Sequence, residues 1–406
     1  MDHEVTEPEA LADQIESLLQ RPDGALDEKT RRRLVEGGRK LAESLELPRE
    51  TYRRIQYSHL VLPLALVGAD TGVFSALSSE NRAFGSAELA EKTGVEIELL
   101  KRLLRYYQAT GMVSQIADDE YQSSNVTHVL SSENHGDSLR FTHKITAQGS
   151  SNLPDWLRST QYESPIGVMP TAWTSAIPTE LDPFSYLKHN PWALKLHQSH
   201  MVVQRVGRKS FIDALDFEKR FAQNDITSST FLFVDIGGGA GAQSLAFRQQ
   251  YPNLPGRVLV QDRPEVIERV KSMLIDTANI EAEAYNFSTT PQPIRGNYAL
   301  AIRARVYYVR NIFHAYGDAK CVEILLNIKA GMTEQSVLII DEIVFPEKNA
   351  KGQAAEHDIE VMICVGGVER TEGQWAGLLS DAGLKVREVA KYDEDYEDAL
   401  IIAGLA

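Results

Sequence analysis

The residues best suited to chemistry begin with an acid and a glycine cluster that directly follow an apolar run, in Phe231-Leu-Phe-Val-Asp-Ile-Gly-Gly-Gly-Ala-Gly241. This pattern is typical of a buried strand that leads into a nucleotide-binding turn. Glycine permits tight-turn angles and lets a ligand approach main-chain N–H groups without an intervening Cβ. The spacing G-x-G-x-G differs from the G-x-G-x-x-G of dinucleotide enzymes that bind a pyrophosphate. We therefore expect an adenosine ligand without a pyrophosphate.

A second acid supports this interpretation. Asp262 ends a short buried-strand pattern, Arg257-Val-Leu-Val-Gln-Asp262. A carboxylate at about this distance after the glycine turn accepts the two hydroxyls of a ribose. Strand, glycine turn, helix, strand and terminal acid together are more specific than the turn alone.

A proton acceptor follows the predicted strand 304–309, in Arg310-Asn-Ile-Phe-His314-Ala-Tyr-Gly-Asp318. The imidazole of His314 can accept a proton near neutral pH, because its unperturbed pKa is about 6.5. Taken alone, such a histidine is more often a hydrogen-bonded structural residue.

Further acids stand at two other strand or loop ends. Asp341 and Glu342 close the predicted strand 337–343, and Glu369 opens a helix in Gly366-Gly-Val-Glu-Arg-Thr371. A carboxylate bonded to one imidazole nitrogen fixes the tautomer and stabilises the imidazolium that forms when the other nitrogen takes a proton. Acids are also favourable at helix N-termini. That role does not explain why acids, a histidine and a glycine turn share one sheet edge.

Alternating strands and helices are expected to position these residues. The predicted strands are 231–236, 258–261, 304–309, 337–343, 385–389 and 399–403, and the predicted helices are 242–250, 264–274, 319–330 and 371–382. This order predicts a parallel sheet covered on both faces, with ligands at the carboxyl ends of its strands.

The N-terminal part has the order of elements of a winged helix. A capped helix at 86–94 precedes a helix at 98–110 and a two-stranded wing at about 113–122. This fold also reads DNA, but the second helix offers only Lys101, Arg102 and Arg105, and the chain carries a formal net charge of −15. We therefore expect a role in protein–protein contact, such as dimerisation, and no nucleic-acid partner.

The segment between the winged helix and the sheet is rich in aromatic residues and histidines. Residues from about 138 to 216 contain, among others, Trp156, Trp173, Tyr186 and Trp192, and the loop 161–182 carries three prolines. This composition indicates a flexible lid or an irregular wall beside an aromatic, apolar substrate. Four parts are expected: an N-terminal helical extension (1–50), the winged helix (51–135), this helical section (136–225) and the sheet domain (226–406).

Composition places the chain among ordinary globular proteins. It has 406 residues, of which 43% are hydrophobic and 24% charged. Its two cysteines, Cys321 and Cys364, form no disulfide framework and indicate a reducing compartment. The acidic N-terminus does not resemble a secretory signal, and no apolar run reaches the length of a membrane span. A cytoplasmic protein without a membrane partner is expected.

Together these segments resemble the S-adenosylmethionine-dependent O-methyltransferases of fungal secondary metabolism. The resemblance extends from about Tyr52 to the C-terminus and includes the glycine turn, the Gly256–Asp262 strand, Thr290-Pro-Gln-Pro-Ile294, the His314 segment and Glu369-Arg-Thr371. It implies a Rossmann-like methyltransferase domain with a mostly parallel seven-stranded sheet, a winged-helix dimerisation domain and a homodimer. The expected substrate is a small phenolic or polyketide-derived molecule.

The resemblance also assigns roles to residues. It implies that His314 is the general base and that Glu369 and Glu342 support it, with Asp341 one residue away as an alternative to Glu342. Asp262 would hold the ribose, and Tyr316 would pack on the adenine, where tryptophan is usual. The residues expected to bind S-adenosylmethionine are Asp235, Gly237, Gly238, Gly239, Asp262, Arg263, Asn286, Phe287, Arg310 and Tyr316, and no metal ligand is assigned.

Three departures from the family pattern keep a second function open. Ala315 stands where the family usually has aspartate, Asn286 replaces a common acid, and residues 297–303 look like an insertion. A related fungal group keeps the fold and binds S-adenosylmethionine but catalyses pericyclic reactions, such as dehydration followed by Diels–Alder or Alder-ene closure in 2-pyridone pathways. The alternative to methyl transfer is therefore a pericyclase that uses the cofactor's positive charge without donating its methyl group.

Overall fold

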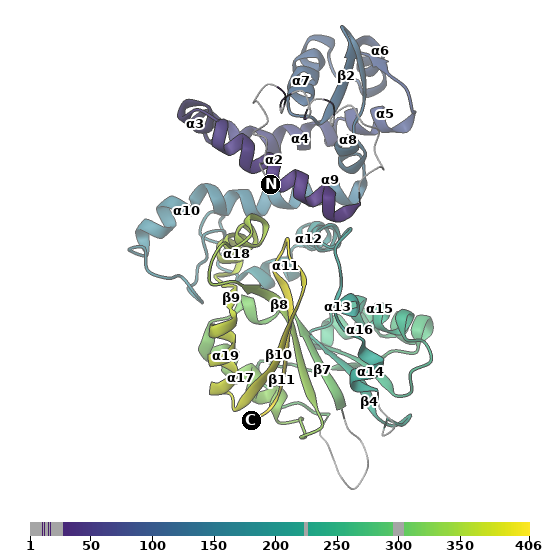
Figure 1. Ribbon diagram of the computed structural model, residues 1–406, viewed down its shortest axis with the longest axis vertical. Coiled ribbons are helices and arrows are strands. Elements are labelled where there is room, and N and C mark those ends of the chain that lie inside the picture. Colours follow the sequence, from purple (N-terminus) through teal and green to yellow (C-terminus); the bar gives the residue numbers. More distant parts are fainter. Residues whose placement is uncertain are drawn as a thin grey trace, which may run out of the picture. The chain divides into compact units, whose positions relative to one another are not determined.

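The computed structural model describes residues 27–222, 226–294 and 304–406, together with positions 10, 12, 15 and 17 (Figure 1). The chain divides into two compact units, residues 1–67 and residues 68–406. The insertion predicted at 297–303 lies outside the described residues. The domain boundaries predicted near residues 50, 135 and 225 stay predictions.

From residue 27 onward, the first unit is helical. Helix α2 spans Glu28–Leu45, α3 spans Pro48–Tyr57, a 3₁₀ turn covers Ser58–Leu60, and α4 begins at Val61 and ends at Asp70. Asp27 caps α2 by accepting a hydrogen bond from the Thr30 amide at 3.0 Å. Neither α2 nor α3 buries a residue. No single described helix is long and apolar enough to cross a membrane, although a bent pair within Pro48–Ser79 passes by length and composition.

The second unit begins with the predicted winged helix. Its elements are α5 (Val73–Ser79), β1 (Phe84–Gly85), α6 (Ser86–Thr93), α7 (Ile97–Ala109), β2 (Val113–Ala117) and β3 (Glu120–Ser123). The three strands pair antiparallel in the order β1-β3-β2. Gly94 ends α6 in the left-handed conformation, with φ +70°, which confirms the predicted helix stop.

A helical section follows and holds its own core. It comprises α8 (Asn125–Leu130), α9 (Glu133–Phe141), a π-helical turn (Thr142–Thr146), α10 (Ala147–Ser159), α11 (Pro183–His189), α12 (Pro191–Val203), α13 (Phe211–Ala214) and α14 (Phe217–Phe221). Phe141, Trp156, Trp173 and Leu196 pack together with Ile363 of the later helix α18. Part of the predicted proline-rich loop is therefore core, because Trp173 is 2% exposed.

The C-terminal part is the predicted Rossmann-like sheet. Its strands are β4 (Phe231–Ile236), β5 (Arg257–Asp262), β6 (Glu281–Ala284), β7 (Ala304–Arg310), β8 (Val337–Phe345), β10 (Leu384–Asp393) and β11 (Asp398–Leu405). They lie in the order β10-β11-β8-β7-β4-β5-β6, and the short strand β9 (Arg370–Thr371) pairs with β8. The strand order reverses between β4 and β7, which makes their carboxyl ends the expected ligand site.

Helices cover both faces of this sheet (Figure 1). On one face, α17 (Asp318–Lys329) and α19 (Glu372–Asp381) bury Ile324, Leu325 and Trp375 against the strands. On the other, α15 (Ala242–Gln250) and α16 (Pro264–Ala278) pack with α13 and α14 around Phe233 and Phe247. The remaining helix, α18 (Gly352–Val365), precedes β9.

The structure corrects the expectation of a wholly parallel sheet. Strands β4 to β8 are parallel, but β11 pairs antiparallel with both β8 and β10. Four residues separate β10 from β11, and so short a connection joins only antiparallel strands. The mostly parallel seven-stranded class is confirmed. Strand β8 also continues past Asp341 and Glu342 to Phe345, so these acids lie within the strand and do not end it.

Candidate active site at the carboxyl edge of the sheet

The glycine turn after β4 is held against the end of β5. The amide of Gly237 donates to the Gln261 carbonyl at 2.7 Å, and the amide of Gly239 donates to Asp262 Oδ2 at 2.9 Å. A Cβ on Gly238 would lie 2.7 Å from Cγ of Asp235, so only glycine allows this carboxyl to approach the turn. At Gly239 the backbone has φ +56° and an added Cβ would meet nothing within 4 Å, which leaves the turn open on that side.

Asp235 is buried beneath this turn. Its Oδ2 accepts a hydrogen bond from the Ser244 hydroxyl at 2.8 Å. Burial raises the pKa of Asp235 to about 7, because the charged form loses its hydration, and the Ser244 hydrogen bond only partly offsets this effect. Asp235 is thus a buried acid held directly under the predicted nucleotide site.

The other predicted cofactor residues surround the end of β5 and the segment after β6. Asp262 Oδ1 accepts from the Arg263 amide at 2.7 Å, so each oxygen of this carboxylate takes one backbone hydrogen bond and keeps a further lone pair for a hydroxyl. Asn286 closes a local turn by accepting from the Ser288 amide at 3.1 Å. Phe287 lies near Gly237. Burial raises the pKa of Tyr316, although a hydrogen bond to Ser288 opposes this rise.

His314 lies on a 3₁₀ turn, Phe313–Ala315, just after β7. Its Nδ1 is 2.7 Å from Oε1 of Glu369 and 3.6 Å from Oε2 of Glu342. The other oxygen of Glu342 accepts from the amides of Ile312 and Phe313 at 2.8 and 2.9 Å, so the carboxylate fixes the backbone that carries the histidine. The structure therefore brings together the three residues predicted to be catalytic.

The protonation of His314 is set by opposing influences. Burial lowers the pKa of the imidazole, but the carboxylates of Glu369 and Glu342 outweigh it and raise the pKa to about 9. Burial in turn raises the pKa of Glu342 to about 7. In the ligand-free protein at neutral pH, His314 is therefore mainly the imidazolium.

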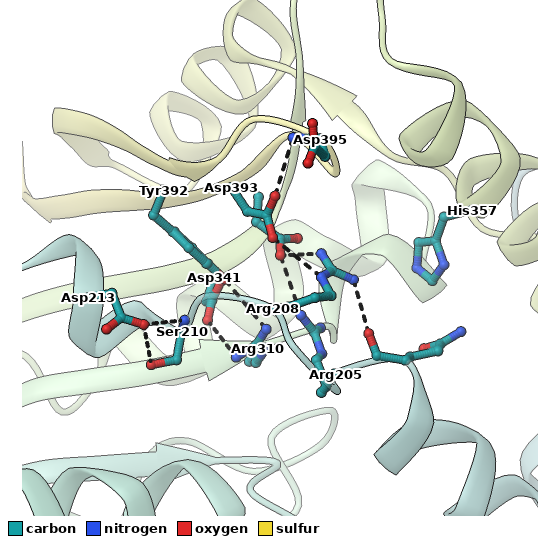
Figure 2. Close-up of polar contacts among 12 residues, drawn as sticks. Arg205, Arg208, Ser210, Asp213, Arg310, Asp341, His357, Tyr392, Asp393 and Asp395 are labelled. Atoms are coloured by element: carbon teal, nitrogen blue, oxygen red, sulfur yellow. Dashed lines mark hydrogen bonds and ion pairs between the residues drawn. The ribbon is translucent and has the colours of Figure 1, made fainter. Parts of the chain in front are cut away.

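The choice between Asp341 and Glu342 follows from strand geometry. Successive side chains on a strand point to opposite faces, and Asp341 pairs with Arg310 of β7 in register. Asp341 accepts a hydrogen bond from the Tyr308 hydroxyl. It also accepts one from the Tyr392 hydroxyl at 2.7 Å and forms an ion pair with Arg310 at 3.2 Å (Figure 2). The acid beside His314 is Glu342.

Arg310, predicted to contact the cofactor, belongs to this buried ionic network. Its charge also acts on Asp235, where it favours the ionised carboxyl against burial. A second group of ion pairs joins Arg208 and Arg205 to Asp398, and Arg208 to Asp393 (Figure 2). The charge of Arg310 thus acts both on Asp235 under the glycine turn and on Arg205 after α12.

Comparisons with known proteins agree with this geometry. Residues 195–385 match the model of an O-methyltransferase domain. The demethylsterigmatocystin 6-O-methyltransferase of Aspergillus flavus is 32% identical over 86% of each chain. Two solved structures, titled "A Pericyclic Reaction enzyme" and "The structure of LepI complex with SAM", are 31% identical, cover 98% of this chain and 99% and 100% of theirs, and have TM-scores of 0.86 and 0.85.

This chain belongs to the S-adenosylmethionine-dependent O-methyltransferases. The residues at its glycine turn fit the family's cofactor: the open side of Gly239, the free lone pairs of Asp262 and the half-buried ring of Tyr316 offer space, hydroxyl acceptors and a stacking face. The nucleoside would be held by Asp262 and Tyr316, and the glycines would let it approach the main chain.

Sequence reasoning gave no role to Arg370. Its guanidinium donates to the carbonyls of Phe313 and Tyr316, at 3.1 and 2.8 Å, and to Asp318 at 2.7 Å. These bonds fix both ends of the turn that carries His314. Arg370 directly follows Glu369, so its place in Glu-Arg-Thr was the available signal.

Gly367, Asp358 and His357 were also missed. A Cβ on Gly367 would lie 2.1 Å from the carbonyl oxygen of His314, so glycine is required where the Glu369 segment passes the base. Asp358 Oδ1 accepts from the Glu369 amide at 2.8 Å. His357 Nε2 lies 3.7 Å from Glu369 Oε1. Both α18 residues lie 11 or 12 positions before Glu369, and no recognised motif covers them.

Proposed function

We propose that this protein transfers a methyl group from S-adenosylmethionine to a phenolic or enolic hydroxyl of a small, polyketide-type secondary metabolite, with His314 as general base. The observation that carries the proposal is the 2.7 Å contact between His314 Nδ1 and Glu369. An Nδ1–H that donates to this carboxylate leaves Nε2 as the acceptor for the substrate's proton.

The residues around His314 have separate roles in this reaction. Glu369 fixes the tautomer of His314 and stabilises the imidazolium after proton transfer, while Glu342 holds the Ile312 and Phe313 amides and adds negative charge. The bound cofactor supplies an electrophilic methyl group on a sulfonium. The protein's main contribution is to hold the hydroxyl in line with that methyl group while His314 removes the proton.

The name of the demethylsterigmatocystin enzyme supports a hydroxylated polyketide as the substrate class. The exposed apolar side chains on α2 and α3 support a homodimer, and the acidic charge supports a protein without nucleic-acid or membrane partners. A cytoplasmic location is part of the same proposal.

Label transfer tests this function. Protein, methyl-labelled S-adenosylmethionine and a panel of phenolic polyketides should yield a labelled ether together with S-adenosylhomocysteine. His314→Gln should lower the rate by roughly 100-fold or more, because it removes the proton acceptor. His189→Gln, which changes an exposed histidine, is the matched control and should not. An unchanged rate in His314→Gln would refute the role of this residue as base.

A second candidate, a pericyclase that retains its cofactor unchanged, is favoured by two observations. One is the likeness to the structure titled "A Pericyclic Reaction enzyme". The other is the raised pKa of His314, because an imidazolium can donate a hydrogen bond to a substrate carbonyl and promote dehydration. This candidate predicts product without S-adenosylhomocysteine, and stoichiometric demethylation of the cofactor would eliminate it.

A further inference from the structure

The surroundings of His314 contain more ligand atoms than proton transfer uses. Within the described part of the chain, His314, His357 and Glu369 form a group in which one atom from each lies within 4.8 Å of the others. Glu369 Oε1 lies 2.7 Å from His314 Nδ1 and 3.7 Å from His357 Nε2. The contact of 3.7 Å is too long for a hydrogen bond.

Two further oxygens point to a missing ligand. Oε2 of Glu342 and Oε2 of Glu369 are buried and have no hydrogen-bond partner, and both side chains are 1% exposed or less. A buried carboxylate oxygen without a partner is costly, unless a cation or a donor occupies the space it faces. Glu342 Oε2 lies 3.6 Å from His314 Nδ1, so it faces the same group of atoms.

We propose that His314, His357, Glu369 and Glu342 form a binding site for a divalent transition-metal ion, of which Zn²⁺ is the representative. Two imidazoles and two carboxylates are a ligand set that zinc accepts. Ligand atoms about 2.0–2.1 Å from a tetrahedral ion lie about 3.4 Å apart. The observed separations of 2.7, 3.6 and 3.7 Å bracket this value, so small side-chain rotations bring the four atoms to one ion.

Separate elements hold the four ligands. His314 lies on the turn after β7, Glu342 on β8, His357 on α18 and Glu369 immediately before β9. The Glu369 amide is bound by Asp358, and the His314 carbonyl accepts from the Val368 amide at 2.8 Å. His357 is 23% exposed, which gives an ion a route from solvent. Because the ligands are far apart in the sequence, their spacing gave no metal motif.

A bound metal ion would prevent His314 from acting as a base. This consequence rests on the proposed function, in which His314 removes the substrate's proton. A neutral imidazole that binds a metal through Nδ1 carries its proton on Nε2. His314 then has no free nitrogen for a substrate proton, and the ion also takes Glu369 from its role as hydrogen-bond acceptor. Zinc therefore acts as a reversible inhibitor of proton removal at this site.

Calorimetry on the full chain, freed of metal with a chelator and without cofactor, tests the site directly. One Zn²⁺ per chain should bind in the micromolar range or tighter. His357→Gln should weaken this binding at least about 100-fold, and His357→Cys, which keeps a zinc ligand, should stay within about tenfold of the parent. His189→Gln, at an exposed histidine, should match the parent, and circular dichroism should show that all variants are folded.

Two results overturn the proposal. One is the absence of zinc binding with micromolar or higher affinity. The other is equal zinc affinity in the parent and in His357→Gln, which would assign the ion to surface groups. Substituted Co²⁺ should give the visible spectrum of a four-coordinate site, and this spectrum should change in Glu342→Gln. Because these measurements need no turnover, failure of methyl transfer in metal-free protein would refute the proposed function alone, and failure of zinc binding would refute the site alone.

Discussion

At the scale of single residues, the protonation state of His314 decides which of the two candidate reactions the site can perform. Its pKa is raised to about 9 by Glu369 and Glu342, against the effect of burial, so the imidazolium predominates at pH 7. A general base must be neutral. In metal-free protein the methyl-transfer rate should rise about tenfold per unit between pH 7 and 8 and level off near pH 9.

Removal of one carboxylate tests the cause of this profile. Glu369→Gln should lower the pKa of His314, so the rising limb should move to lower pH while the maximal rate falls by roughly 100-fold. Glu372→Gln, an exposed acid on α19, is the control and should leave the profile unchanged. Product formation without demethylation of the cofactor, at a rate that falls as pH rises through 9, would require the imidazolium and would support the pericyclase.

Arg370 offers a second prediction at the residue scale. Its buried guanidinium binds the Phe313 and Tyr316 carbonyls, so Arg370→Met should leave these acceptors unpaired and lower the free energy of unfolding by about 2–4 kcal/mol. Urea unfolding with parallel kcat measurements checks this. Asp318→Asn, at a carboxylate 76% exposed, should cost less than about 1 kcal/mol. Equal losses in both variants would contradict the anchoring role of the carbonyl contacts.

At the scale of elements, the segment between α18 and β9 positions Glu369 against the base. In Gly367→Ala the new methyl group would lie 2.1 Å from the His314 carbonyl and 2.6 Å from Val361, so the segment must move away. We expect kcat to fall by about 100-fold, with a smaller change in the KM for the cofactor. Gly377→Ala on α19, where an added Cβ meets nothing within 4 Å, should keep full activity. Normal activity in Gly367→Ala would show that the close approach is dispensable.

The elements that sequence reasoning located are those with a strong pattern of their own. Helix α15 was predicted at its observed bounds, because Gly241 precedes it and Pro252 follows it closely. Strands β4, β5 and β7 were predicted within one residue, because each contains a short apolar run. Strand β6 was missed, since Glu281-Ala-Glu-Ala lacks β-branched or aromatic residues and lies at the sheet edge. Strand β10 was predicted too short, since bulges near Glu388 and Asp393 break its alternation.

Site residues that follow the end of a strand could be predicted from the sequence. Site residues that lie on a packed helix could not. His314 and Glu369 stand next to recognisable turns. The orientation of Glu342 depends on the register of β8 against β7, which pairs Arg310 with Asp341 and leaves the next side chain to face the base. His357 reaches the site only through the packing of α18, and no local spacing encodes that packing.

At the scale of the whole molecule, a buried ionic network joins the segment after α12 to the sheet. Arg208 pairs with Asp398 and Asp393, and all three side chains are 11% exposed or less (Figure 2). Arg208→Met would leave these acids without their main partner and should lower the free energy of unfolding by about 3–5 kcal/mol. Lys188→Met breaks an exposed pair with Glu265 and should cost less than about 1 kcal/mol. Thermal and urea unfolding distinguish the two results, and comparable losses would show that burial does not strengthen the network.

The N-terminal helices carry the last prediction. Helices α2 and α3 bury none of their residues, yet they expose large apolar side chains, including Leu34, Leu45, Tyr52 and Ile55. Apolar side chains gathered on exposed helices are typical of a surface that a second copy covers. Light scattering after gel filtration should therefore give twice the 45.3 kDa of one chain. Ile55→Glu should shift the protein toward monomer, because it places a charge in the apolar surface.

Arg49→Glu changes the charge of the same helix but removes no apolar side chain, so it separates the loss of apolar contact from charge repulsion. It should leave the protein dimeric at concentrations where Ile55→Glu dissociates. If the parent chain is monomeric at about 10 μM, the apolar helices have another partner and the homodimer is wrong. If both variants dissociate equally, repulsion between acidic chains of net charge −15 accounts for the effect, and α3 contributes no apolar interface.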